Sequence, residues 1–183
     1  MKIRDSKNKE YEKVIFLDID GVLNDESTKS FKKKIFVEEI RVKRLKDIVQ
    51  ATQAKIVMSS SWRHYFKLYN ENPESIKDNY ELSKMKDLKN MLDKYDLSVS
   101  DYTQYLETGP DARPLEIRQW MLDKANLKRF VILDDDDFWN WSWLTDYFVM
   151  TKRKGDNYNM IRGLEDDHVK CAIKILNRQI TFY

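Results

Sequence analysis

Two aspartates and a glycine, Asp18, Asp20 and Gly21, follow directly after four apolar residues at 14–17. Such an apolar run is typical of a strand that is buried on both faces. Because side chains two residues apart in an extended chain point to the same side, both carboxylates leave the strand end together. Two carboxylates this close repel each other unless a cation or a shared proton lies between them. The spacing therefore predicts a chemical site at this strand end.

Polar residues follow two further strand-like segments. The apolar run at 56–58 ends in serines that include Ser59 and Ser60, and the run at 130–133 ends in four aspartates. In open α/β sheets, ligands bind beyond the carboxyl ends of the strands. Taken alone, the serines are more typical of helix caps and the aspartates of a solvated turn. Together with the paired aspartates, they predict a metal and phosphate site at one edge of a sheet.

The elements that position these residues alternate between strands and helices. Such alternation predicts an α/β fold: a Rossmann-like, doubly wound, mainly parallel sheet of about five strands with helices on both faces. Residues 70–83 are interpreted as a loop with a weak helix inside it. We expect strands at 14–18, 55–59, 97–102, 130–133 and 147–150, and helices at 37–52, around 85–95, from 114 and from about 166.

The composition limits the class of protein. A chain of 183 residues with 42% hydrophobic residues can bury one sizeable core, so we interpret 1–183 as one domain with 1–12 as a lead-in. The 33 basic and 31 acidic residues nearly cancel, which neither requires nor excludes a nucleic-acid partner. A single cysteine, Cys171, excludes an internal disulfide framework and fits a reducing compartment. No stretch approaches the roughly 20 apolar residues of a membrane span, so we expect a cytoplasmic protein without a membrane partner.

Four segments resemble the motifs of haloacid dehalogenase (HAD)-type phosphatases, in the same order and over nearly the whole chain. Within that superfamily they are most similar to the HAD phosphatase domain of modular, Swiss-army-knife RNA-repair proteins. The phosphatase halves of polynucleotide kinase-phosphatases share the layout. The matching segments are DIDGVLN at 18–24, IVMSSSWR at 56–63, ARPLEIRQW at 112–120 and VILDDDD at 131–137.

The resemblance implies roles for the aspartates. Asp18 is expected to be the nucleophile that forms an aspartyl-phosphate, and Asp20 the general acid that protonates the leaving oxygen and then activates water. It also implies a Mg²⁺ cofactor, a hard ion that takes carboxylate and phosphate oxygens. The expected ligands are Asp18, the backbone carbonyl of Asp20, and Asp134 with Asp135.

The resemblance also implies residues that bind the phosphoryl group. Ser59 matches the hydroxyl that contacts the transferred phosphoryl group, and Ser60 is a second candidate donor. Arg113 stands where the family usually has a lysine; arginine can neutralise phosphate through two parallel hydrogen bonds, although the two residues are not interchangeable. Arg63 and Arg118 are the alternatives, and Arg63 is included among the expected phosphate ligands.

The sequence leaves little room for a cap domain over the site. We fit at most a minimal lid at 64–83, and an open site admits bulky substrates such as nucleic-acid ends. Trp139, Trp141 and Trp143 follow the acidic cluster at alternate positions and are interpreted as packing residues. The alternative hypothesis is that Trp139 or Trp141 stacks on a substrate base.

These observations predict a Mg²⁺-dependent phosphatase that hydrolyses phosphomonoesters. The expected substrates are terminal phosphates of RNA or DNA, or nucleotides. One alternative is a small-metabolite phosphatase of the same fold, and another is a non-catalytic module that binds phosphate or nucleic acid. The presence of both Asp18 and Asp20 argues against the module, because a binding protein needs no nucleophile.

Overall fold

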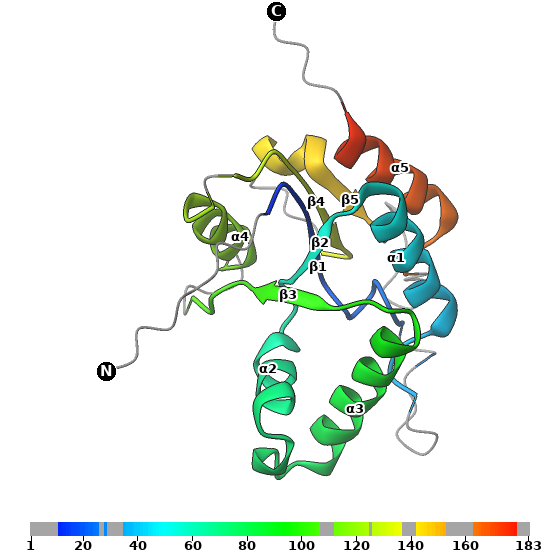
Figure 1. Ribbon diagram of the computed structural model, residues 1–183, viewed down its shortest axis with the longest axis vertical. Coiled ribbons are helices and arrows are strands. Elements are labelled where there is room, and N and C mark those ends of the chain that lie inside the picture. The colour runs from blue at the N-terminus through cyan, green and yellow to red at the C-terminus, as the bar shows by residue number, and fades with distance from the viewer. Residues whose placement is uncertain are drawn as a thin grey trace, which may run out of the picture.

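Five strands form a single sheet in a computed structural model of the chain, in the order β3-β2-β1-β4-β5 (Figure 1). Every neighbouring pair is parallel, which confirms the predicted Rossmann-like α/β fold. The strands are β1 (Lys13–Leu17), β2 (Lys55–Met58), β3 (Val99–Tyr102), β4 (Arg129–Asp134) and β5 (Phe148–Met150). The structure describes residues 11–25, 28, 35–106, 112–124, 126–136, 142–152 and 163–178.

Helices cover both faces of the sheet, as the sequence predicts. In Figure 1, α1 and α5 lie side by side on one side of the strands, and α4 lies on the other. The α-helices are α1 (Glu39–Thr52), α2 (Arg63–Glu71), α3 (Asn79–Lys94), α4 (Ala112–Leu122) and α5 (Asp166–Asn177), and two short 3₁₀ helices are η1 (Pro73–Ser75) and η2 (Ser142–Tyr147).

Alternate side chains of each central strand enter different cores, because successive residues of a strand point to opposite faces. Ile15 and Leu17 of β1 pack in the core that includes α1 and α5. Val14 and Phe16 pack in the second core with Ile117 of α4. These four residues of β1 are fully buried, which explains their unbroken apolar run and fixes the strand end that carries Asp18.

The segment between β2 and β3 differs from the expectation. Residues 70–83 were expected to form a loop with a weak helix, but they contain the end of α2, the short helix η1 and the start of α3. The Asp78 side chain caps α3 by accepting hydrogen bonds from the backbone N–H groups of Tyr80 and Glu81. This local cap and the packing of α2 against α3 explain why the segment is mostly helical.

Helices α2 and α3 lie next to each other and extend away from the sheet in Figure 1. The second half of α3 returns to the core, where Met85, Leu88 and Leu92 are buried. The predicted lid at 64–83 thus covers most of α2, η1 and the start of α3, where Phe66 and Ile76 are buried in the core, and its action as a lid stays a prediction. In the part of the chain that the structure describes, no helix has the length and apolar composition needed to cross a bilayer.

Candidate active site

The carboxyl ends of β2, β1 and β4 meet at one edge of the sheet. The backbone N–H of Asp18 donates to the Leu133 carbonyl at 3.0 Å, and the N–H of Ser59 donates to the Leu17 carbonyl at 3.0 Å. These two bonds continue the strand pairing one residue beyond β1 and β2. The predicted convergence of the strand-end polar residues is therefore confirmed for Asp18, Ser59 and the aspartates that end β4.

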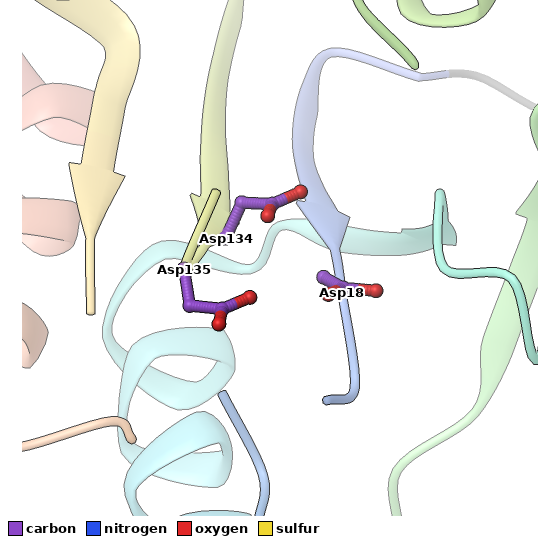
Figure 2. A group of neighbouring side chains, drawn as sticks. All are labelled: Asp18, Asp134 and Asp135. Carbon is purple, nitrogen blue, oxygen red and sulfur yellow. The ribbon is translucent and has the colours of Figure 1, made fainter. Parts of the chain in front are cut away.

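Three of the predicted aspartates form a compact acidic cluster. Asp18, Asp134 and Asp135 can each offer one carboxylate oxygen such that these atoms all lie within 4.8 Å of one another. Figure 2 shows Asp134 and Asp135 at the end of β4, beside Asp18 after β1. Asp18 and Asp134 are buried, and Asp135 is partly exposed. A set of carboxylate oxygens suits a hard divalent cation such as Mg²⁺ or Ca²⁺.

The electrostatics of this acidic cluster favour a cation. Burial, reinforced by the negative charge of Asp18, raises the pKa of Asp134 to about 8 and the pKa of Asp135 to about 6. Burial also raises the pKa of Asp18 itself. The protein alone therefore does not stabilise three ionised carboxylates here at neutral pH. A divalent cation supplies the missing charge, so the residues present fit a metal site.

Arg113 on α4 is the cation that the structure places at the cluster. Its Nη1 atom lies 2.6 Å from Asp134 Oδ2 and 3.3 Å from Asp18 Oδ2. Burial works against the charged guanidinium, but the charges of Asp134 and Asp18 raise the pKa of Arg113 above its ordinary value. Arg113 is therefore permanently charged and stands where the resemblance expects a lysine.

Asp20 lies outside this acidic cluster and accepts hydrogen bonds from Trp62 and Asn24. Trp62 Nε1 donates to Asp20 Oδ2 at 2.8 Å, and Asn24 Nδ2 donates to Asp20 Oδ1 at 3.2 Å. Trp62 is buried at the start of α2, so its indole is a rigid support. Sequence reasoning missed this contact, although Trp62 belongs to the same SSSWR motif as the serines.

The two predicted serines are both buried beside Asp18. Burial raises the pKa of Asp18, and the charge of Arg113 together with a hydrogen bond from the Ser60 hydroxyl partly opposes that rise. The Ser59 hydroxyl is buried and has no hydrogen-bond partner among the described residues. A buried hydroxyl without a partner costs free energy, so this group is available to a ligand oxygen.

Arg63 has a different environment from the one expected for a phosphate ligand. Its Nη1 atom donates to the Ser59 carbonyl at 3.1 Å and to the Ser60 carbonyl at 2.8 Å. Its Nη2 atom donates to Glu116 Oε1 at 2.8 Å, and both side chains are buried. Glu116 also accepts from the backbone N–H of Leu106 at 3.0 Å. Arg63 and Glu116 thus hold the serine turn against α4, and phosphate binding by Arg63 stays a prediction.

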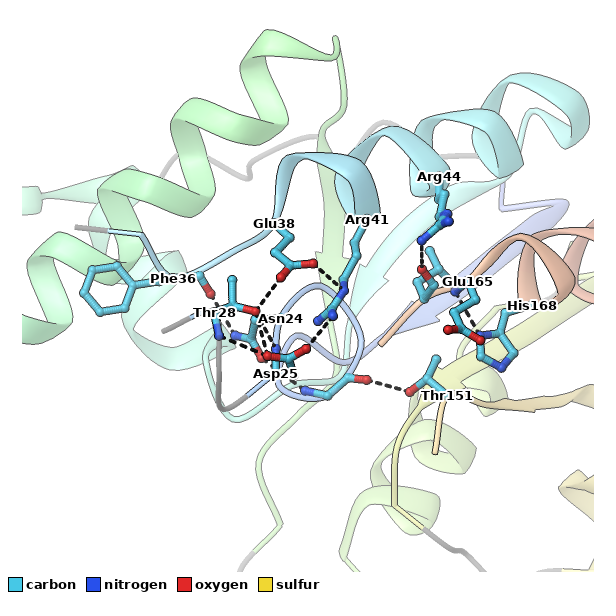
Figure 3. Close-up of polar contacts among 12 residues, drawn as sticks. Asn24, Asp25, Thr28, Phe36, Glu38, Arg41, Arg44, Thr151, Glu165 and His168 are labelled. Atoms are coloured by element: carbon cyan, nitrogen blue, oxygen red, sulfur yellow. Dashed lines mark hydrogen bonds and ion pairs between the residues drawn. The ribbon is translucent and has the colours of Figure 1, made fainter. Parts of the chain in front are cut away.

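The turn after β1 is fixed by contacts from distant segments (Figure 3). The Gly21 carbonyl accepts from Thr151 Oγ1 at 2.7 Å, and the Gly21 N–H donates to Asn24 Oδ1 at 3.1 Å. Asn24 Nδ2 donates in turn to the Phe36 carbonyl at 2.8 Å. An ion pair of 2.6 Å between Arg41 and Asp25 secures the end of the turn.

Gly21 adopts φ of +69°, and a Cβ atom there would collide with the side chain of Asp135. We expect Gly21→Ala to displace Asp135 and to abolish stabilisation by Mg²⁺ in thermal unfolding. Gly163→Ala is the control for backbone strain and steric collision, because Gly163 has φ of +66° and a Cβ atom there would collide with Arg41, outside the acidic cluster. In each variant the left-handed backbone conformation should lower the free energy of unfolding by about 1–2 kcal/mol. An unchanged Mg²⁺ response in Gly21→Ala would contradict the placement of Asp135 at the metal.

Several predictions concern residues outside the described part of the chain. Trp139 and Trp141 lie there, and with them the base-stacking hypothesis, as do Asp137 and the first ten residues of the lead-in. Asp136 is described; it is exposed, and its backbone N–H donates to Asp134 Oδ1 at 2.9 Å. Its contact thus orients one carboxylate of the acidic cluster.

Comparison with known proteins agrees with the motifs and the fold. The family model described as the HAD domain in Swiss Army Knife RNA repair proteins matches residues 14–168. No curated protein and no solved structure matches the chain. The matched range runs from β1 into α5 and includes the whole acidic cluster, Arg113 and both serines. The chain therefore belongs to the family of HAD domains found in Swiss Army Knife RNA repair proteins.

Proposed function

We propose that the protein is a Mg²⁺-dependent phosphomonoesterase that acts through an aspartyl-phosphate on Asp18. Its substrates are terminal phosphates of RNA or DNA, or nucleotides. The observation that carries the proposal is the buried cluster of Asp18, Asp134 and Asp135 with Arg113 beside it. Membership of a family of RNA-repair domains supports the choice of substrate.

Mg²⁺ would be held by the acidic cluster and by the Asp20 backbone carbonyl, and when bound it would offset repulsion between Asp18 and an incoming phosphate dianion. The side chain of Arg113 adds a second positive charge. The Ser59 hydroxyl, which has no hydrogen-bond partner within the described ranges, donates to a phosphoryl oxygen. Together these groups orient the phosphorus atom toward Asp18.

The reaction proceeds in two displacements at phosphorus. In the first, a carboxylate oxygen of Asp18 bonds to phosphorus while the bond to the leaving oxygen breaks, and Asp20 gives that oxygen its proton. In the second, Asp20 takes a proton from water as the water oxygen bonds to phosphorus. The bond between phosphorus and Asp18 then breaks, which releases inorganic phosphate and restores both aspartates.

Trp62 is a positioning residue for Asp20 through its 2.8 Å hydrogen bond. Trp62→Phe should lower kcat/KM for nucleotide phosphates by about tenfold to a hundredfold, the loss expected for a hydrogen bond to a charged group. The loss should be smaller for nitrophenyl phosphate, whose leaving group needs little proton donation. Trp120→Phe is the matched control, since Trp120 Nε1 donates to Asp101 instead. An equal loss of kcat/KM on both substrates would show that Trp62 does not act through proton donation by Asp20.

The proposal is tested by a panel of substrates with Mg²⁺ and with EDTA. The panel holds mononucleotides, oligonucleotides phosphorylated at either end, phosphopeptides and sugar phosphates. We expect phosphate release from the nucleotide and oligonucleotide members and its loss in EDTA. Faster release from sugar phosphates would favour the small-metabolite phosphatase. Tight binding without release from any member would favour the non-catalytic module.

A further inference from the structure

A cavity of about 620 Å³ lies beside the serine turn, between α2 and the segment that follows β3. Its lining includes Ser61 and Arg63 on one side and Thr103 and Tyr105 on the other. The backbone N–H of Thr103 donates to the Met58 carbonyl at 3.1 Å, which places this segment at the carboxyl end of β2. The volume falls within the range of about 300–1,000 Å³ of pockets that bind small organic ligands.

The cavity is separate from the acidic cluster but lies on the same edge of the sheet. The acidic cluster is at the ends of β1 and β4, and the cavity is at the ends of β2 and β3. Neighbouring strands are about 4.8 Å apart, so the cavity begins about 5–10 Å from Asp18. One nucleoside spans such a distance between its phosphate and its base.

Two side chains of the cavity offer contacts suited to a base. The Tyr105 ring is 78% exposed, and its centroid lies 5.6 Å from the Arg63 guanidinium carbon. Thr103 is only 4% exposed, yet its hydroxyl has no hydrogen-bond partner among the described residues. An unpaired buried hydroxyl is costly in the free protein and is satisfied by a polar ligand. An accessible aromatic ring is a surface on which any base can stack.

The charges around the cavity favour a nucleic-acid strand. His64 and Lys67 of α2 line it, and within the described residues Lys67 forms no ion pair. The negative charge of the lining residue Asp101 is offset by residues that do not line the cavity. Asp101 accepts a hydrogen bond from Trp120 Nε1 at 3.1 Å and pairs with Lys124 at 3.3 Å. The remaining charge is positive, which suits a phosphodiester and is unfavourable for an acidic peptide.

We propose that this cavity binds the base of the phosphorylated terminal nucleotide of a single-stranded nucleic acid. The base stacks on Tyr105 and hydrogen-bonds to the Thr103 hydroxyl, while Lys67 faces the adjoining phosphodiester. The inference rests on the proposed function, because it is Asp18 that fixes where the terminal phosphate lies. It adds a base-recognition site that is independent of Trp139 and Trp141.

The test measures binding as well as hydrolysis. The probes are short single-stranded oligonucleotides that carry a phosphate at one end, 5′ or 3′, and a fluorescent label at the opposite end. Asp18→Asn protein is titrated into each probe, and binding is measured as the rise in fluorescence anisotropy. Adding Tyr105→Ala should weaken binding by about tenfold, within the range for loss of one base–aromatic stack, and Tyr105→Phe should restore it. Thr103→Val should weaken binding by a smaller factor, because it removes one hydrogen bond.

A matched oligonucleotide whose terminal nucleotide lacks its base completes a double-mutant cycle. With that probe, Tyr105→Ala should have no effect. In protein that retains Asp18, Tyr105→Ala should lower kcat/KM for the intact oligonucleotide by a similar factor. It should leave kcat/KM for glycerol phosphate, which has no base, unchanged. Equal losses with and without the base would overturn the proposal, and so would a loss confined to a phosphopeptide.

The outcomes separate this inference from the proposed function. If the protein hydrolyses glycerol phosphate and Tyr105→Ala changes neither binding nor hydrolysis of the oligonucleotide, the base site is wrong and the phosphatase stands. If no substrate is hydrolysed but binding depends on both Tyr105 and the terminal base, the phosphatase is wrong and the base site stands.

Discussion

Replacing Asp18 by asparagine should abolish phosphate release, with a loss of at least about 10⁴-fold in kcat/KM. An amide of nearly the same shape cannot attack phosphorus to form an acyl phosphate. The fold should persist, because Asp18 is buried and its pKa is raised, so the protein already disfavours the charge that the substitution removes. Arg113 keeps its closer partner, Asp134, in this variant.

The measurement compares phosphate release by wild type and Asp18→Asn on the best substrate, together with thermal unfolding of each. Asp136→Asn is the control, since Asp136 belongs to the same acidic run as Asp134 but is exposed and outside the acidic cluster. It should retain activity within a few-fold. Substantial phosphate release by Asp18→Asn would show that Asp18 is not the nucleophile.

Without metal, the protein should become less stable as the pH rises from 5 to 8, and Mg²⁺ should remove this loss. The folded-state pKa of Asp135 is raised from 3.8 to about 6 and that of Asp134 from 3.8 to about 8. The folded state therefore binds protons more tightly than the unfolded state, and ionisation on raising the pH favours unfolding. We expect a fall in Tm on the order of 10 °C over this window.

Mg²⁺ binds the ionised acids of the folded protein, so it should stabilise most at the upper end of this pH window. Asp134→Asn should remove much of the pH dependence and of the Mg²⁺ response, and should lower kcat/KM by about 10³-fold. Asp123→Asn, an exposed residue after α4, should preserve both responses. If Asp134→Asn responds to Mg²⁺ as wild type does, the metal lies elsewhere.

The fold and the acidic cluster could be predicted from sequence because both depend on short local patterns. Strands buried on both faces must be apolar throughout, so 14–17 and 130–133 stand out in a chain rich in charge. In a parallel sheet the residue after each run lies at the same edge. That rule alone brings Asp18 and Asp134 together, as the structure confirms.

The features that could not be predicted from the sequence depend on contacts between residues far apart in the chain. Helix α2 is absent from the predicted elements; it buries Arg63 and Phe66 and is stabilised by packing on α3. A basic residue after three serines suggests a phosphate ligand. Arg63 also pairs with Glu116, 53 positions away, and no local pattern indicates this pairing.

The turn after β1 gives a second example. The DxDG pattern predicts the acids and the turn, but not what holds Asp20 in place. Trp62 is 42 positions from Asp20, and Thr151 is 130 positions from Gly21. These contacts decide the orientation of the proposed acid and the closeness of Gly21 to Asp135, and they require the folded chain.

The most direct test of the account is to trap the covalent intermediate. Asp20→Asn protein is mixed with nitrophenyl phosphate and Mg²⁺, quenched in acid within the first turnover, treated with borohydride and mapped by mass spectrometry. The nitrophenolate leaving group needs no acid, but the attack of water does need Asp20 as its base, so the aspartyl-phosphate on Asp18 should accumulate. If Asp18 is the nucleophile, borohydride should convert it to homoserine. Phosphate release with no modification of Asp18, or with a modification elsewhere, would contradict this assignment.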